Sequence, residues 1–156
     1  MTDEIEIVHA LPAHAGEVAR LFDAYRCWYG KESDPEGARH FISQRLRLNE
    51  AEIFFARRKE KAVAFAQLYP MFTSVGMGRV WILNDLFVDE SARRSGVGTM
   101  LLETVTEFAK QLGAVRLQLE TWPSNTAAIA AYEALGWKRD AEFLNYSLDL
   151  TDTDQG

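Results

Sequence analysis

The segment Arg93-Arg94-Ser95-Gly96-Val97-Gly98 has the composition of an anion-binding turn. An apolar run precedes it and an amphipathic stretch follows it, so we expect a strand before the turn and a helix after it. Two glycines two positions apart let the backbone approach a ligand closely, and the first N–H groups of a helix point toward it. The helix dipole and the two arginines favour negative charge. Taken alone, the segment fits an anion site and an ordinary glycine turn with solvated arginines equally well.

Two common phosphate-binding motifs do not fit this segment. A P-loop needs Gly-Lys-Ser/Thr, and no such sequence is present here. The third glycine of the dinucleotide fingerprint is replaced by Leu101. A phosphoryl-transfer enzyme would also need its lysine and paired metal carboxylates. An anion bound at this segment would therefore belong to another class of ligand.

A polar pair, Asn84-Asp85, interrupts the apolar run from Arg79 to Val88. Burying such groups without partners costs about 2–7 kcal/mol for a neutral polar group. A β-bulge at this point would re-aim both side chains and free backbone groups for a ligand. The alternative is that Asp85 caps a turn or pairs with a nearby arginine. We favour the bulge.

A third segment begins at Asn125 and ends at Trp137. Asn125 and Tyr132 are seven residues apart, so they share one face of a helix, with small alanines between them. Each has a simpler interpretation, Asn125 as an N-cap and Tyr132 as a core aromatic with a solvated hydroxyl.

In this order and spacing, the three segments resemble the GNAT superfamily of N-acetyltransferases. Arg93-x-x-Gly96-x-Gly98 matches the acetyl-CoA pyrophosphate motif, and Asn125-x-x-Ala128-x-x-x-Tyr132-Glu133-x-x-Gly136-Trp137 matches the second signature. The resemblance is close from Trp81 to Trp137. It implies acetyl-CoA as co-substrate and direct acyl transfer in a ternary complex.

The resemblance also implies roles for individual residues. One backbone N–H of the strand would polarise the thioester carbonyl. Tyr132 could protonate the leaving thiolate, and Asp85 or Glu120 could take the proton of the amine. The expected cofactor contacts are Leu86, Phe87 and Val88 with the pantetheine arm, Asn125 with the same arm, and the turn of Arg93, Arg94, Ser95, Gly96, Val97, Gly98 and Thr99 with the pyrophosphate.

The acceptor is less constrained by the sequence. Tyr25, Trp28 and Tyr29 could line its pocket, with Glu32 or Asp34 meeting a cation, or the aromatics could be core and the acids solvated. The loop 71–78 could contribute. Leu83 to Val88 resembles the polyamine acetyltransferase branch, which usually has an acidic residue where this sequence has Asn84. We predict a small-molecule amine; the alternatives are an amino acid, a protein N-terminus or lysine, an antibiotic, or a non-catalytic acyl-CoA sensor.

The elements that position these residues follow from periodicity and from Gly and Pro signals. They predict one α/β domain of the α+β-type GNAT fold over residues 1–150, with a polar, fraying tail at 151–156. Its sheet is mixed and mostly antiparallel, with helices on both faces. The expected strands are 4–8, 51–57, 62–69 ended by Pro70, 79–88, 115–121 and 143–150, with one more possible near Trp137. The expected helices lie between Pro12 and Gly30, between Ser33 and Leu46, at 98–112 and at 125–135.

The composition of the chain also indicates which ligands and which cellular compartment to expect. The 156 residues carry a net charge of -6, which argues against nucleic acid as the main ligand. Cys27 is the only cysteine and we see no secretory or membrane segment, so we expect a cytoplasmic protein. The scattered His9, His14 and His40 do not predict a metal site. Homodimers are common in the GNAT superfamily, which this sequence resembles, so a homodimer is a possible state of this chain.

Overall fold

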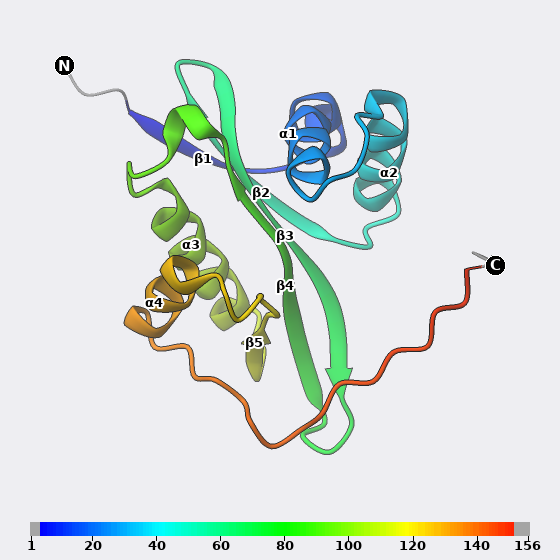
Figure 1. Cartoon of the computed structure of the whole chain (residues 1–156), viewed down its shortest axis with the longest axis vertical. Coiled ribbons are helices and arrows are strands. Elements are labelled where there is room, and N and C mark those ends of the chain that lie inside the picture. Colours follow the sequence, from blue (N-terminus) through cyan, green and yellow to red (C-terminus); the bar gives the residue numbers. More distant parts are fainter. Residues whose placement is uncertain (1–3, 152–156) are drawn as a thin grey trace. The chain divides into compact units, whose positions relative to one another are not determined.

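The computed structural model (Figure 1) describes residues 4–151 of the chain. They belong to two units, Met1–Glu120 (unit 1) and Thr121–Gly156 (unit 2). Unit 1 contains a five-stranded sheet and three α-helices, and unit 2 contains one α-helix, α4 (Thr126–Ala134). None of the described helices is both long and apolar enough to cross a membrane.

The sheet of unit 1 has the order β1-β2-β3-β4-β5. The first three pairings are antiparallel and the β4–β5 pairing is parallel. A mixed, mostly antiparallel sheet was expected from the sequence and is confirmed. The strands are β1 (Ile5–His9), β2 (Glu52–Arg58), β3 (Lys61–Thr73), β4 (Gly78–Val88) and β5 (Arg116–Gln118).

Helices cover both faces of this sheet, as predicted (Figure 1). On one face, α1 (Ala15–Trp28) and α2 (Pro35–Arg47) bury an apolar cluster with β2, β3 and β4. On the other face lies α3 (Val97–Gln111), whose Phe108 ring is 5.3 Å from Phe54 and 5.5 Å from Trp81. Short 3-10 helices, η1 (Pro12–His14) and η2 (Glu90–Ala92), precede α1 and α3. The two apolar layers fix the sheet between the helices.

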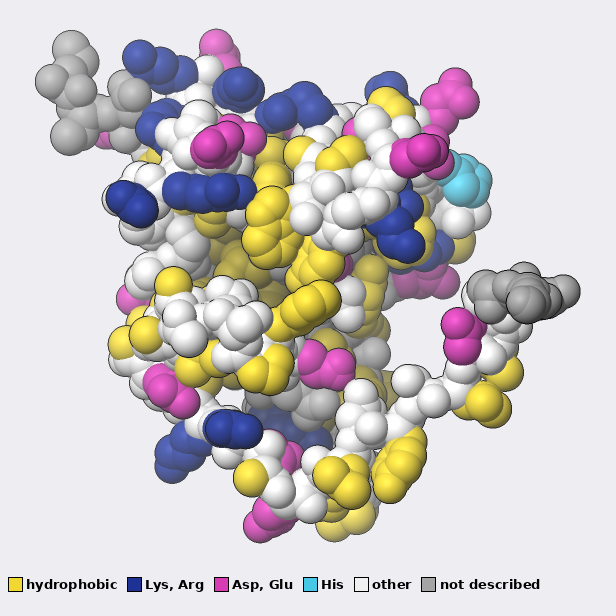
Figure 2. Space-filling model, viewed as in Figure 1, with side chains coloured by type: hydrophobic (Ala, Val, Ile, Leu, Met, Phe, Trp, Pro, Cys, Tyr) yellow, Lys and Arg dark blue, Asp and Glu magenta, His cyan; other side chains and the backbone are white. Residues whose placement is uncertain are grey.

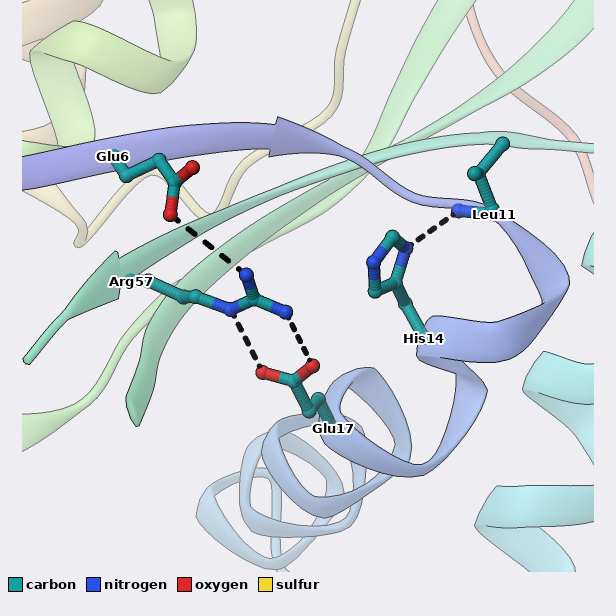
Figure 3. Close-up of polar contacts among 5 residues, drawn as sticks. All are labelled: Glu6, Leu11, His14, Glu17 and Arg57. Carbon is teal, nitrogen blue, oxygen red and sulfur yellow. Dashed lines mark hydrogen bonds and ion pairs between the residues drawn. The ribbon is translucent and has the colours of Figure 1, made fainter. Parts of the chain in front are cut away.

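A polar cluster ties the start of α1 to the sheet (Figure 3). Arg57 of β2 donates two hydrogen bonds to Glu17 of α1, at 3.1 and 2.7 Å, and lies 3.7 Å from Glu6 of β1. The hydrogen bond from Arg57 holds the pKa of Glu17 below its usual value. The backbone N–H of Leu11 donates to His14 Nδ1 at 2.9 Å, which closes the turn before α1.

Pro70 does not end its strand, contrary to the prediction. β3 continues to Thr73, and Pro70 is paired with Trp81 of β4. Proline lacks an N–H donor, so a strand tolerates it only where no neighbouring strand needs a hydrogen bond from that position. The pairing of β3 with β2 stops at Leu68, so Pro70 lies where β3 has a partner on one side only. The expected loop 71–78 is reduced to a turn at residues 74–77.

The strand predicted over 143–150 is wrong for this structure, as is the possible strand near Trp137. Neither segment has strand pairing, and the apolar side chains of Phe143, Leu144, Tyr146 and Leu148 are exposed. Figure 2 shows hydrophobic side chains on the surface of the molecule. Alternating polarity marks a segment that suits a sheet, but a strand forms only when a neighbour supplies its backbone partners. No described segment pairs with 143–150 in this structure.

The single domain over 1–150 stays a prediction. Of the predicted tail at 151–156, residues 152–156 lie outside the described part of the chain.

Candidate active site

The turn before α3 has a backbone that requires glycine at one position. Gly96 is the N-cap of α3 and has φ +84°, in the left-handed region, and Arg94 has φ +63°. The first hydrogen bond that closes α3 runs from the Met100 N–H to the Gly96 carbonyl, at 3.1 Å. The N–H groups of Val97, Gly98 and Thr99 precede that bond at the positive end of the helix dipole. This geometry suits a bound anion.

Gly98 is not required by the fold. A Cβ at Gly98 would meet only Val88 Cγ2, at an ordinary 3.7 Å, and the residue lies in helical backbone. A small residue at this place keeps the start of the helix open to a ligand.

Arg93 ties the turn to the sheet, a role that the sequence pattern does not predict. Its Nε donates to the Val88 carbonyl at 3.0 Å, and its guanidinium lies 6.0 Å from the Phe87 ring centre. Ser95 Oγ donates to the Ala92 carbonyl and closes the turn on η2. The turn is therefore held at the end of β4, with Arg94 exposed.

One edge of β4 is open over its second half. β5 pairs with Val80, Trp81 and Ile82 only, whereas β3 pairs with β4 as far as Val88. Within residues 4–151, no strand pairs with the β5-side edge of β4 after Ile82. An extended ligand arm can add to such an edge like a further strand. The predicted pantetheine contacts, Leu86, Phe87 and Val88, lie on this edge and lead to the turn at Arg93.

The predicted bulge is present, and Asn84 is the extra residue. Gln67 of β3 is paired with Asp85, and the next residue, Leu68, is paired with Leu83, so Asn84 has no opposite partner. Asn84 is exposed and Asp85 is buried, with 6% of its surface accessible. The bulge keeps Asp85 on the face that α1 and α2 cover, next in alternation to Phe87.

Several donors converge on the buried Asp85 carboxylate. Gln67 Nε2 donates at 2.7 Å, and Asn84 Nδ2 lies 3.2 and 3.3 Å from the two oxygens. Tyr25 of α1 also hydrogen-bonds to Asp85. Burial, then the charge of Asp85, raises the pKa of the Tyr25 phenol far above its usual value, so Tyr25 remains a donor. Burial and the Asp85 charge likewise raise the pKa of Tyr69 to about 12.

An aromatic series connects this carboxylate with the surface. The ring centres of Trp28 and Tyr29 are 5.1 Å apart, and those of Tyr29 and Tyr25 are 5.0 Å apart. Trp28 is 63% exposed and Tyr29 48% exposed, whereas Tyr25 packs on Phe65 and Phe87. The structure thus brings the predicted acceptor residues Tyr25, Tyr29 and Asn84 together with Asp85. The turn at 74–77 is distant: Asp85 lies seven positions after Gly78 along β4, roughly 20 Å of strand.

The remaining candidate site residues are Glu120 in unit 1 and Asn125 and Tyr132 in unit 2. Glu120 is exposed and lies two residues beyond the end of β5. In unit 2, Asn125 is the N-cap of α4, but its side chain donates to Thr121 Oγ1 at 3.2 Å and makes no cap bond. Tyr132 is half-buried, with its ring centre 6.0 Å from that of Trp137. Asn125 and Tyr132 keep the predicted spacing along one helix.

Gln67 was missed by the sequence analysis. It is fully buried, with 0% of its surface accessible, and its Oε1 has no hydrogen-bond partner. The signal was present: Gln67 is the one polar residue between Ala62 and Leu68. A polar side chain inside an apolar strand needs a hydrogen-bond partner when it is buried, as Asp85 does. No group of three or more His, Cys, Asp or Glu residues suited to a metal occurs among the described residues.

The comparisons with known proteins identify the family. The sequence model of the acetyltransferase (GNAT) family matches residues 18–137. The chain belongs to the GNAT family. It is 40% identical, over 94% of its length and 98% of the relative's, to an uncharacterized N-acetyltransferase of Bacillus subtilis (strain 168).

Solved structures of acetyltransferases share this fold. The crystal structure of a probable acetyltransferase has a TM-score of 0.88 and 42% identity, over 94% of this chain and 99% of that one. An aminoglycoside N-acetyltransferase in complex with CoA has a TM-score of 0.77 at 20% identity, over 95% and 97% of the two chains, and shows the shared fold alone. The chain is therefore an acetyl-CoA-dependent N-acetyltransferase, as its motifs predicted.

Proposed function

We propose that this GNAT enzyme transfers the acetyl group of acetyl-CoA to a primary amine of a small molecule, by direct attack in a ternary complex. The observation that carries the proposal is the buried Asp85 carboxylate, which a bulge positions in the strand whose open edge leads to the glycine turn before α3. An acceptor nitrogen at Asp85 and a thioester along β4 would meet at the same strand. The aromatic series from Trp28 to Tyr25 offers an entry for a narrow ligand.

The residues of unit 1 would bind and orient both substrates. The N–H groups from Arg94 to Thr99 would hold the pyrophosphate, and Leu86, Phe87 and Val88 would pair with the pantetheine arm. One N–H of that strand edge would donate to the thioester oxygen as it gains negative charge. Asn125 of unit 2 would also contact the pantetheine arm.

Proton transfer accounts for the remaining chemistry. A free alkylamine has a pKa near 10.4, so most of it is protonated at pH 7 and cannot attack. Asp85 would take one proton from the ammonium, and the freed lone pair would form the bond to the carbonyl carbon. As the carbon–sulfur bond breaks, Tyr132 would donate its hydroxyl proton to the thiolate, and the second proton that the nitrogen loses on becoming an amide would return through water to the Tyr132 oxygen. We favour Asp85 over Glu120 as base because donors orient the buried carboxylate, whereas Glu120 is exposed.

The test measures binding first and turnover second. Acetyl-CoA should raise the melting temperature, whereas NAD and ATP should not. Thiol release from acetyl-CoA should then depend on the amine across a panel of small primary amines. Stabilisation by ATP or NAD alone would refute the cofactor assignment. Stabilisation by acetyl-CoA with no thiol release on the whole panel would favour an acyl-CoA sensor.

A further inference from the structure

Gln67 faces Asp85 across the β3–β4 pair, and only one end of its side-chain amide has a partner. Its Nε2 donates to Asp85 Oδ2 at 2.7 Å, whereas its buried Oε1 accepts no hydrogen bond. A buried acceptor without a donor costs about 1–3 kcal/mol. The amide cannot satisfy Oε1 by turning over, because that would set an oxygen against the carboxylate. The position therefore lacks a donor.

The surroundings of the Gln67 amide define which donor fits. The Asp85 carboxylate supplies negative charge beside it, and the rings of Phe65 and Phe87 are next on the same face of the two strands. Tyr25 packs on both rings, at 5.8 and 5.9 Å between ring centres. Aromatic faces and a carboxylate attract a cation, and Oε1 attracts an N–H. An ammonium group that still carries hydrogens satisfies all three.

We propose that Gln67 positions the acceptor: its amide nitrogen orients Asp85, and its carbonyl oxygen accepts a hydrogen bond from the acceptor ammonium. This inference rests on the proposed function and deepens it: the acceptor must be an ammonium group with at least two N–H bonds, one for Asp85 and one for Gln67, which a primary amine provides and a tertiary amine does not. Quaternary ammonium ions carry the same charge but no donor. Tyr25 would shift to admit the ligand, since it packs on Phe65 and Phe87 and hydrogen-bonds to Asp85.

The substitution Gln67→Met tests this role because it keeps the length of the side chain and removes both polar ends. The kcat/KM for the amine should fall by about 10- to 100-fold, the range for losing a hydrogen bond to a charged group. The KM for acetyl-CoA should change by no more than about twofold, because a twofold change is smaller than the effect of losing one hydrogen bond. The matched control is Gln111→Met on α3, an exposed glutamine that contacts Glu107 and should leave both constants unchanged.

A binding measurement separates this inference from the proposed function. The full-length protein, labelled with ¹⁵N and saturated with CoA, is titrated with n-butylamine and with butyltrimethylammonium. The Gln67 side-chain amide signals, assigned by their loss in Gln67→Met, should shift with n-butylamine and not with the quaternary ion. The preference for n-butylamine should shrink about tenfold or more in Gln67→Met.

The outcomes are distinct. Equal binding of the two ions, or no shift of the Gln67 amide with n-butylamine, overturns the role of Gln67 even if the enzyme acetylates amines. A shift of the Gln67 amide without acetylation of any amine supports the ammonium site and counts against the proposed function. An unchanged kcat/KM in a folded Gln67→Met variant also overturns the inference.

Discussion

The glycine turn before α3 supplies a prediction in which strain and ligand binding can be separated. Gly96 has φ +84° and Gly113 has φ +73°, and a Cβ at either would have no heavy atom within 4 Å. Alanine in the left-handed region costs about 1–2 kcal/mol. Because neither site has a steric clash to add, Gly96→Ala and Gly113→Ala should destabilise the protein by this same amount. At about 2–4 °C per kcal/mol, the melting temperature should fall by about 2–8 °C in each.

The two variants should differ in their affinity for acetyl-CoA. Gly113 follows the C-terminal end of α3, whereas Gly96 is its N-cap, beside the N–H groups that we assign to the pyrophosphate. If the strained turn shifts, those N–H groups lose their alignment, and each hydrogen bond to a charged group contributes about 1.5–3 kcal/mol. We therefore expect the Kd for acetyl-CoA to rise at least about tenfold in Gly96→Ala and to stay unchanged in Gly113→Ala.

Isothermal titration with acetyl-CoA and thermal unfolding without ligand measure the two quantities. Gly98→Ala completes the set: its Cβ would meet Val88 Cγ2 at 3.7 Å in helical backbone, so stability should stay equal or rise by about 0.4–1 kcal/mol. Equal Kd values for Gly96→Ala and Gly113→Ala would refute the assignment of the pyrophosphate to this turn. A large loss of stability in Gly98→Ala would refute the reasoning about the helix start.

Three further predictions concern the proton transfers and the link between α1 and the sheet. Tyr132→Phe should keep the Kd for acetyl-CoA and lower kcat by about 10²-fold or more, and an unchanged kcat would remove Tyr132 from the acid role. Asp85→Asn should lower kcat/KM for the amine by a similar factor, about 10²-fold, whereas Glu120→Gln serves as its control and should have little effect; the reverse result would make Glu120 the base. The Arg57 hydrogen bond lowers the pKa of Glu17, so this carboxylate adds stability above its usual pKa of 4.5 that is lost as pH falls through the lowered value. Urea unfolding should show Glu17→Gln less stable than wild type at neutral pH, by a small margin because Glu17 is partly exposed, with the difference vanishing in acid; a constant difference would contradict the ion pair.

The sequence predicted the parts of the fold that depend on local signals. The turn between the strands predicted at 51–57 and 62–69 has positive φ at Lys59 and Glu60, as a two-residue type I′ hairpin requires, and the bulge lies at the polar pair that interrupts β4. The helix after the glycine turn begins at Val97, one residue before the predicted start. Each of these features depends on a few residues that are neighbours in the sequence.

Features that depend on distant pairing were not predicted. Pro70 is tolerated inside β3 because the pairing of β3 with β2 stops at Leu68. The sequence around Pro70 does not indicate where the neighbouring strand ends. The alternation over 143–150 indicated a strand, yet strand formation depends on a partner that no local pattern supplies. Gln67 lies in the site because it is paired with Asp85 across the β3–β4 hairpin. That pairing depends on the position of the bulge, so it could not be predicted before the bulge was located. The sequence therefore predicted features that depend on neighbouring residues, but it did not predict which residues of different strands are paired.

The proposed function requires that the chain acetylates a small primary amine. A competition reaction checks this. It contains acetyl-CoA with equal amounts of small primary amines and of short peptides with free N-termini and lysines, and its products are identified by mass spectrometry. We expect an acetylated small amine in amounts that match the CoA thiol released, with the peptides unmodified. Acetylated peptides with unmodified small amines, or thiol release without any acetylated amine, would contradict the account.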